Sequence, residues 1–555
     1  MSRTKKILRY VTAAVVMVAA AGLFTFAGRD DFGLGRNMEL LVNMMRELSI
    51  NYVDKLDADK LMRGAADGMV SNLDPYTSYL SEEDMKEFEM ATTGKYGGIG
   101  SLIRKRGDYV VIAEPYKGSP ADRAGLKVGD KIVAINKESA KGFTTEQVSS
   151  RLKGDPNTNV KVTIESLIDG ECRTITIRRE RIAIPGISFA GMVNDSIGYI
   201  SHADFTDGCY DDMRAAIERL RQDGKLKGLI LDYRNNGGGI MQEAVKIVSL
   251  FTPKGSEVVS TKGRAENKIF RTELEPLLPE LPMVVLVNGN TASSSEIVAG
   301  ALQDMDRAVV MGQKSFGKGL VQSSLPIGYD AYVKMTTAKY YIPSGRCIQN
   351  IDYSEHRENG RVVADSLVRE FKTRNGRKVY DGGGIMPDVK LEPEYTSNFA
   401  VMLYAMGLVD EFGDEYMKRH HTESINNRTF TISDEEYELF VEFAKAKDVA
   451  YTSETRRALA KLKEAVKADR FDEQLASRIA EMEREVKDDT ESNLRTYRRE
   501  VTDWLNRNIV MRYNYSEGAI EYSLMGDKEV AAAVKLLADT AEYNEILTSR
   551  DTQRK

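Results

Sequence analysis

Two short stretches carry residues whose types and spacing could break a covalent bond. In the first, an apolar run at 282–287 leads into Asn-Gly-Asn-Thr-Ala-Ser-Ser-Ser-Glu at 288–296, and a helix is expected over 297–302. A serine at such a strand-to-helix junction presents its hydroxyl at a sheet edge, beside free helix amides. Serine needs a base, and none of the four histidines lies in a catalytic pattern. The second stretch, Ser-Phe-Gly-Lys-Gly at 315–319, supplies a lysine instead.

Both stretches, with Leu-Asp-Tyr-Arg-Asn-Asn-Gly-Gly-Gly at 231–239, resemble the motifs of the carboxyl-terminal processing, or tail-specific, serine–lysine proteases. The three motifs occur in the order and with the kind of spacing found in that family. The resemblance implies that Ser293 is the nucleophile and Lys318 the general base. It also implies that Gln322, four residues after the lysine, orients the amine.

The same resemblance implies an oxyanion hole. One donor would be the amide of Ser294 and the other the amide of Gly239, with Gly238 as an alternative because three glycines leave the register open. The family usually has alanine where this chain has Ser294, so a second hydroxyl lies beside the nucleophile. Ser294 and Ser295 therefore stay open as alternative nucleophiles.

Lysine can accept the proton of a serine hydroxyl only in its neutral form. Its unperturbed pKa near 10.4 leaves roughly one molecule in two thousand neutral at pH 7, and burial can bring that pKa down to the working pH. The neighbours of Lys318, including Phe316 and Leu320, are apolar. Gln322 is neutral, so it can hold the amine without restoring its charge. We expect Ser–Lys chemistry that needs no metal, no ATP and no other cofactor.

Three other interpretations compete. The serine run alone predicts only a helix start, capped by Ser293 or Ser295. The segment 312–319 nearly matches a phosphate-binding P-loop, but Gly319 lacks the hydroxyl for magnesium and Pro326 makes the following segment a poor helix. A catalytically inactive PDZ scaffold would lack the serine, the lysine or the glutamine, and all three are present.

The region 81–180 has a second pattern. Between expected strands at 109–113 and 160–164, the sequence Gly-Ser-Pro-Ala-Asp-Arg-Ala-Gly-Leu-Lys-Val-Gly-Asp at 118–130 resembles a PDZ domain. The amides of an upstream glycine loop, at Gly98, Ile99 and Gly100, form a nest for the terminal carboxylate of a peptide. The peptide would add as a strand to a sheet edge, with an apolar pocket for its last side chain. A further hypothesis is that this domain covers or misaligns the catalytic site until a tail binds.

Strands alternate with helices from 182 to about 391, which is typical of an α/β core with a largely parallel sheet. Sites in such sheets form at the carboxyl ends of strands, where the glycine run and Ser293 both occur. We predict a mixed, largely parallel α/β protease core with an inserted β-rich PDZ domain and a C-terminal all-α extension. The expected boundaries are 29–80 for an N-terminal helical segment, 81–180 for the PDZ domain, 181–395 for the core and 396–555 for the extension.

The N-terminal 28 residues are typical of an export signal. Arg3, Lys5, Lys6 and Arg9 precede an uncharged run at 10–28. The run is intermediate in length between a signal core and a full span, and Thr-Phe-Ala at 25–27 is an acceptable cleavage site, so cleavage and retention as an inner-membrane anchor both stay open. We expect an exported protein, periplasmic or anchored facing the periplasm or cell exterior.

Composition limits the partners. A chain of 555 residues is too long for one core, and its 42% apolar and 29% charged residues are typical of soluble globular domains. The net charge of −6 disfavours nucleic acid. Cys172, Cys209 and Cys347 give neither zinc spacing nor a disulfide framework. We expect unfolded or tail-exposed proteins as substrates and a homo-oligomer, with the need for an adaptor protein left open.

Overall fold

The computed structural model describes residues 31–353, 361–447, 449, 451–486 and 489–548. The predicted export segment at 1–28 lies outside these residues. No helix within them is both long enough and apolar enough to cross a bilayer. The chain up to residue 72 forms a compact unit of its own, and residues 73–555 form a second unit.

Within residues 31–72, the described part of the first unit, lie the helices α2 (Asp31–Asn51) and α3 (Ala58–Val70). The Asp57 side chain caps α3 by accepting hydrogen bonds from two backbone amides of its first turn. Helix α2 exposes a series of apolar side chains, namely Leu34, Met38, Leu40, Val42, Met44 and Ile50. The predicted helical segment is therefore helical, and α2 has an apolar surface that no described residue of its unit covers.

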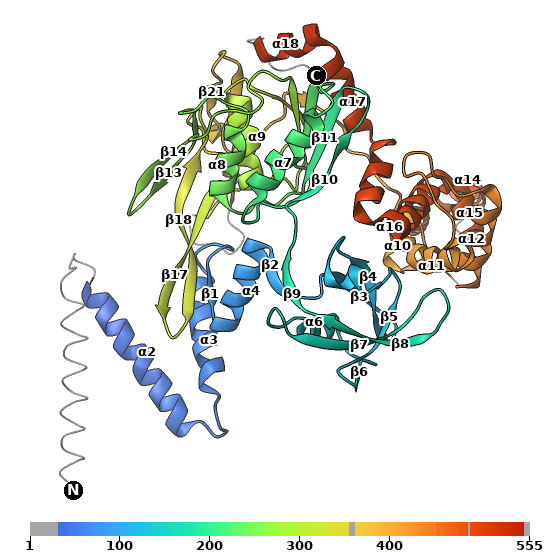
Figure 1. Cartoon of the computed structure of the whole chain (residues 1–555), viewed down its shortest axis with the longest axis horizontal. Coiled ribbons are helices and arrows are strands. Elements are labelled where there is room, and N and C mark those ends of the chain that lie inside the picture. The colour runs from blue at the N-terminus through green and yellow to red at the C-terminus, as the bar shows by residue number, and fades with distance from the viewer. Residues whose placement is uncertain (1–30, 354–360, 448, 450, 487–488, 549–555) are drawn as a thin grey trace. The chain divides into compact units, whose positions relative to one another are not determined.

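The second unit is built around a six-stranded sheet (Figure 1). Its strands, in spatial order, are β10 (Ile187–Met192), β11 (Ile197–His202), β12 (Gly228–Asp232), β15 (Met283–Val287), β16 (Val309–Gly312) and β23 (Val389–Lys390). Only the β10–β11 pair is antiparallel; the other neighbours are parallel. The predicted mixed, largely parallel α/β core is confirmed.

Alternate residues of the central strands point to opposite faces of this sheet and pack against different helices. Both faces are therefore buried. On one face Leu229, Val285 and Val310 pack with the helices α7 (Cys209–Arg221), α8 (Met241–Ser249) and α9 (Ser294–Asp304). On the other face Ile230 and Val284 pack with α17 (Lys528–Ala538) and α18 (Thr540–Thr548). The end of the helical extension is therefore a layer of the core.

A second, five-stranded sheet flanks the core. It consists of β1 (Ser78–Leu80), β18 (Ala331–Tyr341), β13 (Glu257–Gly263) and β14 (Asn267–Arg271) in that order, with β17 (Leu320–Gly328) also pairing with β18. Two separate two-stranded ribbons follow in the chain, β19 (Ile351–Asp352) with β20 (Arg361–Val362) and β21 (Glu370–Lys372) with β22 (Lys378–Tyr380), with the 3-10 turn Asp365–Leu367 between them. The long hairpin β17–β18 thus receives its third strand, β1, from just before the predicted PDZ region.

The predicted PDZ region is a β domain with its own core. Helix α4 (Glu82–Thr93) precedes it, and the ribbon β2 (Lys95–Gly98) with β9 (Glu180–Ala183) brackets it. Its antiparallel sheet contains β3 (Ser101–Arg106), β4 (Tyr109–Pro115), β5 (Lys131–Ile135), β6 (Glu138–Ser139), β7 (Asn159–Glu165) and β8 (Cys172–Arg178), with the helices α5 (Pro120–Arg123) and α6 (Thr145–Leu152). Strand β3 lies at an edge of this sheet.

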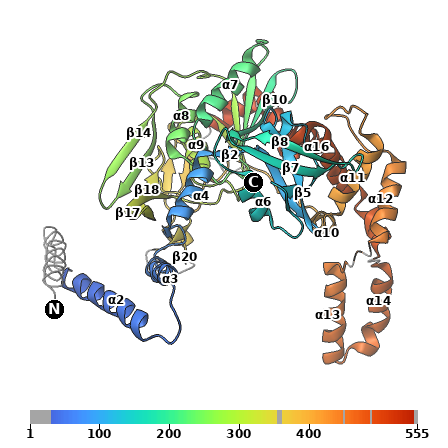
Figure 2. The same ribbon diagram turned by 60° about the horizontal axis from the view of Figure 1, so that its bottom comes forward.

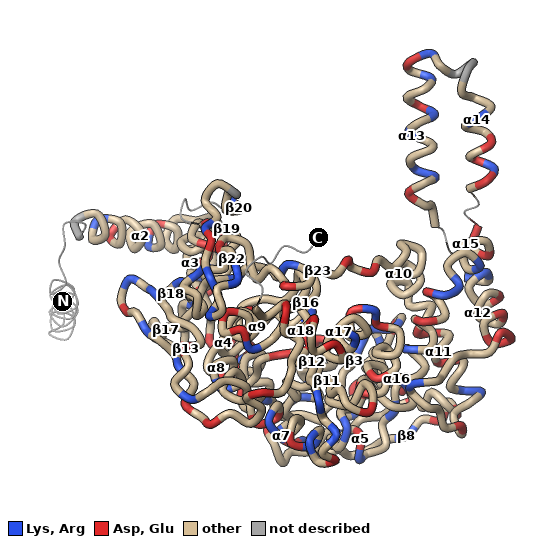
Figure 3. The backbone as a smooth tube through the Cα atoms, turned by 90° about the horizontal axis from the view of Figure 1, so that it is seen from above, with Lys and Arg blue, Asp and Glu red and all other residues tan. Residues whose placement is uncertain are grey.

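The predicted all-α extension begins with a helical domain. Its helices are α10 (Asn398–Ala405), α11 (Leu408–His420), α12 (Asp434–Ala446), α13 (Glu454–Ala468), α14 (Asp472–Glu485), α15 (Thr490–Thr496) and α16 (Arg498–Leu524). The pair α13–α14 projects from this domain (Figure 2) and carries charges of both signs along its length (Figure 3). An ion pair between Lys463 and Glu483 joins the two helices of the hairpin.

Buried ion pairs hold the β domain against the helical domain. The side chain of Arg512 on α16 is fully buried, and its Nη2 lies 2.7 Å from Oδ1 of Asp414 on α11. The other oxygen of Asp414 pairs with Arg106 of β3, and Asp410 pairs with Arg104 of the same strand. One acidic helix thus binds arginines from both domains.

A break in α16 adds to this contact. Tyr515 has φ 59° and ψ −167°, an unfavourable conformation for an aromatic residue. At this break the Tyr515 hydroxyl donates to Asp122 of the β domain, and the Ser516 amide donates to Glu114 at 2.8 Å. The strained turn is therefore the place where the helix contacts the β domain.

We predict that Arg512→Ala destabilises the helical domain by about 3–5 kcal/mol, because it leaves the buried carboxylate of Asp414 with one partner fewer. Urea unfolding followed by the fluorescence of Trp504, which packs on the helical core, measures the change. Arg214→Ala, which breaks an exposed pair with Glu218, is the control and should cost less than about 1 kcal/mol. Equal effects of the two substitutions would contradict a buried cluster.

Candidate active site

Ser293 lies between β15 and α9, and its backbone is strained. Its φ of 58° and ψ of −119° are unusual for a residue with a side chain, at a cost of order 1–3 kcal/mol. Two hydrogen bonds hold this conformation. The Ser293 amide donates to Glu296 at 2.9 Å, and the Tyr340 hydroxyl donates to the Ser293 carbonyl at 3.2 Å. Ser293 is partly exposed.

The next two serines are buried, and their hydroxyls are engaged. Ser294 Oγ donates to the carbonyl of Gly239 at 2.9 Å, and Ser295 Oγ donates to the carbonyl of Asn236 at 3.0 Å. Both bonds fasten the start of α9 to the glycine run after β12. The geometry therefore favours Ser293 over its two neighbours as the nucleophile.

The glycine run packs directly on the serine. A Cβ on Gly238 would lie 2.7 Å from the Cβ of Ser293, so only glycine fits there. The Gly238 amide donates to the Asn236 side chain at 2.8 Å. The amides of Gly239 and Ser294 donate to no partner among the residues that the structure describes. Of the two registers left open by the sequence, this leaves Gly239, with Ser294, as the free donor pair.

Asn236 holds this loop in place, a role that the sequence motif did not reveal. It is fully buried, and its Nδ2 donates to the carbonyl of His202 at the end of β11. Its own carbonyl accepts from the Ala292 amide at 3.0 Å, next to the nucleophile. Asn236 therefore joins three strand ends at one point.

Lys318 lies in the loop between β16 and β17. Gly317 and Gly319 on either side pack so closely on residues 349–350 that a Cβ on either glycine would come within 2.8 Å of them. The lysine side chain extends over the ring of Tyr76, with Nζ 4.6 Å from the ring centroid. Burial lowers the pKa of Lys318, and the nearby positive charge of Lys334 lowers it further.

The predicted dyad is not closed in this structure. Among the described residues, no hydrogen bond joins Ser293 Oγ to Lys318 Nζ. Gln322, on β17, donates through Nε2 to Thr336 Oγ1 at 3.2 Å, and no hydrogen bond joins it to Lys318. The serine, the glycine run and the backbone of the lysine loop are brought together, whereas no hydrogen bond among the described residues joins the lysine amine to the serine or to the glutamine.

Glu296 is the other residue whose role the sequence did not reveal. It is fully buried and accepts hydrogen bonds from the amides of Ser293, Gly317 and Lys318 and from the Ser315 hydroxyl. Burial raises its pKa to about 7, while these hydrogen bonds act to lower it. In the sequence it is an acidic residue in the first turn of an expected helix, which predicts only a cap. Its reach to the lysine loop depends on the tertiary fold.

The P-loop interpretation is wrong. The loop after β16 leads into strand β17 and not into the helix that a P-loop requires. The amides of Gly317 and Lys318, which would bind a phosphate, donate instead to the carboxylate of Glu296. An anionic phosphate would have to displace a buried carboxylate.

The predicted tail-binding loop lies between β2 and β3. The amides of Ile99 and Gly100 have no partner among the described residues, and the Gly100 carbonyl accepts from Ser119 Oγ at 2.7 Å. Gly98 ends β2, whose pairing with β9 fixes the start of the loop. Ile99 contributes to an apolar cluster with Val148 and Leu152 of α6. Free amides beside an edge strand and an apolar cluster fit the expected recognition of a peptide C-terminus.

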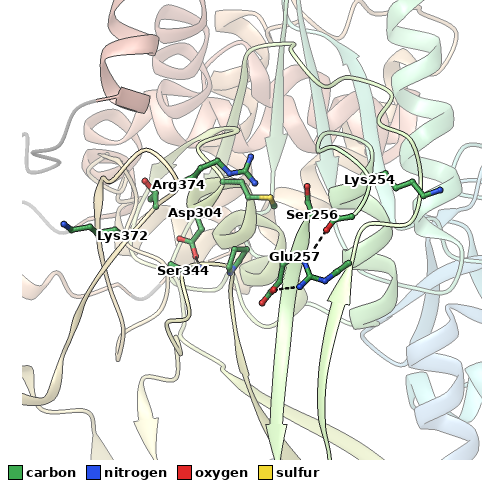
Figure 4. Close-up of a pocket in the computed structure, with 12 residues that line it drawn as sticks. Lys254, Ser256, Glu257, Asp304, Ser344, Lys372 and Arg374 are labelled. Atoms are coloured by element: carbon green, nitrogen blue, oxygen red, sulfur yellow. Dashed lines mark hydrogen bonds and ion pairs between the residues drawn. The ribbon is translucent and has the colours of Figure 1, made fainter.

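A pocket of about 660 Å³ lies elsewhere on the core (Figure 4). Basic side chains surround it, with Lys254 and Lys372 at opposite ends of the view and Arg374 between them. None of the predicted catalytic or tail-binding residues lines it. The catalytic candidates lie instead at the carboxyl ends of β12, β15 and β16, as expected for a parallel sheet.

Four family models match this chain. Residues 196–358 match peptidase family S41, and residues 111–166 match a PDZ domain. Residues 31–84 match the activating protease CtpB N-terminal domain, and residues 399–537 match the probable PDZ-protease, C-terminal helical domain.

Several known proteins are similar to this chain. A carboxy-terminal-processing protease of Bartonella bacilliformis is 36% identical over 335 residues, covering 60% of this chain and 76% of that protein. A probable CtpA-like serine protease of Staphylococcus aureus strain COL is 33% identical over 345 residues, covering 61% and 68%. Among solved structures, the photosystem II D1 C-terminal processing protease matches at 26% identity and a TM-score of 0.35, covering 64% of this chain and 93% of its own.

We predict that Lys334→Gln moves the pH dependence of the reaction toward higher pH. Removing the positive charge raises the pKa of Lys318, so the neutral amine, and with it the rate, reaches its plateau at a higher pH. The rate of Ser293 phosphonylation against pH measures this. Lys339→Gln, on the same strand, is the control and should leave the profile in place. A shift toward lower pH would contradict Lys318 as the base.

Proposed function

The chain belongs to peptidase family S41, as a carboxy-terminal-processing serine protease with a PDZ domain, and from this premise we propose how it acts. It is an exported endopeptidase that binds protein substrates by their free C-terminal tails. It hydrolyses their peptide bonds with Ser293 as nucleophile and Lys318 as base, without ATP or metal. The observation that supports this most directly is the strained Ser293 beside the free amides of Gly239 and Ser294.

In the first step Ser293 Oγ attacks the carbonyl carbon of the scissile peptide bond as its proton passes to neutral Lys318 Nζ. The amides of Gly239 and Ser294 donate to the oxyanion that forms. The C–N bond then breaks, and the amine leaves with the proton from Lys318. A water molecule repeats the sequence on the ester, returning Ser293 to its free form. Each half needs one proton acceptor, and a desolvated lysine supplies it.

For this step Lys318 Nζ must leave the ring of Tyr76 and approach Ser293. Rotation of the lysine side chain is the proposed movement, since the backbone amides of Lys318 and Ser293 already donate to the same oxygen of Glu296. The open dyad fits the hypothesis that the site is closed only when a tail is bound. Tyr76 lies immediately before β1, which pairs with the β17–β18 hairpin. A shift of this hairpin would therefore move both Tyr76 and Gln322.

Tail binding is proposed to use the amides of Gly98, Ile99 and Gly100 for the terminal carboxylate. The peptide adds antiparallel to the edge strand β3, and its last side chain enters the apolar cluster near Ile99 and Val148. Tails ending in apolar residues are preferred for this reason. An adaptor is compatible with this arrangement but is not needed by it.

Two further aspects of the function are proposals. The N-terminal charge and apolar run support export, with the protein periplasmic or retained by an inner-membrane anchor. The apolar side chains that α2 exposes support a homo-oligomer. Nucleic acid is not a partner in this proposal, because the net charge is negative.

The main test is degradation of an unfolded protein with an apolar C-terminal tail, in EDTA and without ATP. Ser293→Ala should slow cleavage by at least about 10³-fold, and Lys318→Ala by about 10²–10⁴-fold. Ser294→Ala is the matched control, since its hydroxyl only fastens the glycine loop, and it should retain cleavage. Cleavage by Ser293→Ala would assign another nucleophile. Tail binding by the wild type without any cleavage would favour an inactive scaffold.

Tail recognition is tested separately by amidating the peptide. Replacing the C-terminal carboxylate by an amide removes charge-assisted hydrogen bonds to the loop at 98–100, so affinity should fall about 10- to 100-fold. Fluorescence anisotropy with labelled peptides measures this on the full chain. A peptide with the carboxylate intact but its third residue changed is the control. Equal binding of the amidated and free tails would contradict carboxylate capture.

A further inference from the structure

We propose that Glu296 is the positioning residue of this active site, and that its carboxylate sets the place of Lys318 relative to Ser293. The inference rests on the proposed function and assigns a role to a residue outside the predicted dyad. Glu296 does not touch the scissile bond in this mechanism. It acts through the backbone of the two residues that do.

The hydrogen bonds divide evenly between the two carboxylate oxygens. Oε2 accepts from the Ser293 amide and from the Lys318 amide, each at 2.9 Å. Oε1 accepts from the Gly317 amide at 2.7 Å and from the Ser315 hydroxyl. Because both amides reach one oxygen, the backbones of the nucleophile and the base share a single anchor atom. Displacing that oxygen would move the backbone of Lys318 relative to the backbone of Ser293.

The four partners of Glu296 favour its ionised form, against the burial that raises its pKa to about 7. All of them are donors toward Glu296, and a carboxylate is the side-chain group that accepts without donating. A glutamine in its place would present its NH₂ group to two donors, and a protonated acid would present its hydroxyl to one. Three backbone amides and a hydroxyl together replace the water that this fully buried group loses.

The same arrangement avoids a direct ion pair with the lysine amine, although the charge of Glu296 still acts to raise the pKa of Lys318 against the effect of burial. Glu296 binds Lys318 through its backbone amide, and among the described residues no ion pair joins its carboxylate to Lys318 Nζ. A direct pair would hold the lysine protonated and disable it as a base. Glu296 can therefore place the base precisely by its main chain while the side chain stays free to lose its proton.

Ser315 extends the anchor to a third segment. The Ser315 hydroxyl accepts from the Ile385 amide at 2.6 Å, and the Ser315 amide donates to the Ile385 carbonyl at 3.0 Å. Gly384 packs so tightly here that a Cβ would lie 2.6 Å from the Ser315 carbonyl. The glycine-rich stretch at 382–384 thus has a structural reason: it lets the chain close on the loop that Glu296 holds.

A double-mutant cycle separates positioning from plain stability. The readout is the rate at which a fluorophosphonate labels Ser293 in the full chain, measured with a saturating peptide that ends in an apolar residue so that the proposed dyad is closed. The variants are Glu296→Gln, Lys318→Ala and the two combined. Glu296→Gln should slow labelling about 10- to 100-fold when Lys318 is present and less than about 3-fold when it is absent. Glu243→Gln, a buried glutamate that accepts the Tyr210 amide, is the matched control and should change neither rate more than about 3-fold.

The outcomes distinguish this inference from the proposed function. Labelling of Ser293→Ala, or wild-type labelling of Lys318→Ala, would overturn the proposed dyad itself. If the dyad holds, an equal slowing by Glu296→Gln in both backgrounds, or no slowing in either, would overturn the positioning role. Should Glu296→Gln fail to fold by circular dichroism, Ser315→Ala removes only one of the four donors. It should slow labelling about 3- to 10-fold with Lys318 present and not in its absence, and equal effects would again overturn the role.

Discussion

One buried carboxylate connects the parts of this active site. Glu296 lies in the first turn of the helix that follows the proposed nucleophile, and its oxygens accept hydrogen bonds from the loop that carries the proposed base. A charge without water is costly, so the loop must stay where its amides can reach it. The free-energy cost of burying the Glu296 charge thereby restricts the position of this loop. The amides of Ser293 and Gly317 and the hydroxyl of Ser315 all donate to this group.

The sheet beneath the site is supported from both faces by distant parts of the chain. Helices α7–α9 cover one face, and α17 and α18 from the C-terminal extension cover the other. Arg234, beside the glycine run, pairs with Asp527 and Glu529 at the start of α17 at 2.7 Å each. The extension is thus joined to the strand end that supplies the proposed oxyanion donor. The middle of the extension has another role, since α11 and α16 hold the β domain through the Arg512 cluster.

A lysine base suits an enzyme with an open resting site. The amine must be both desolvated and hydrogen-bonded to the serine; Lys318 is desolvated and lies over Tyr76, and among the described residues no hydrogen bond joins it to Ser293. Tyr76 and Gln322 lie on or beside the β1–β18–β17 sheet, which joins the core to the segment leading to the tail-binding domain. Small movements of that sheet can therefore separate or unite the dyad without rearranging the nucleophile.

The sequence by itself determined the α/β core, the β domain, the helical extension, and the residues at the strand ends. These follow from local patterns: alternation of strands with helices, glycines beside reactive side chains, and apolar neighbours around Lys318. The sequence also favoured Ser293 among three serines. Only the structure showed that the hydroxyls of Ser294 and Ser295 donate hydrogen bonds to backbone carbonyls of the glycine run. The choice of Gly239 over Gly238 likewise needed the position of the Asn236 side chain.

Only the tertiary structure decided the roles of Glu296 and Tyr76, the present partner of Gln322 and the covering of the sheet by α17 and α18. In the sequence Glu296 is one more acidic residue in a first helical turn, and Gln322 is four residues from the lysine that it was expected to orient. Each of these roles depends on a contact between residues far apart in the chain, or on which of two nearby partners a side chain binds. Local periodicity reports which face of an element is buried. Local periodicity carries no information on which distant segment covers that face, because the covering segment is determined by the packing of the whole chain.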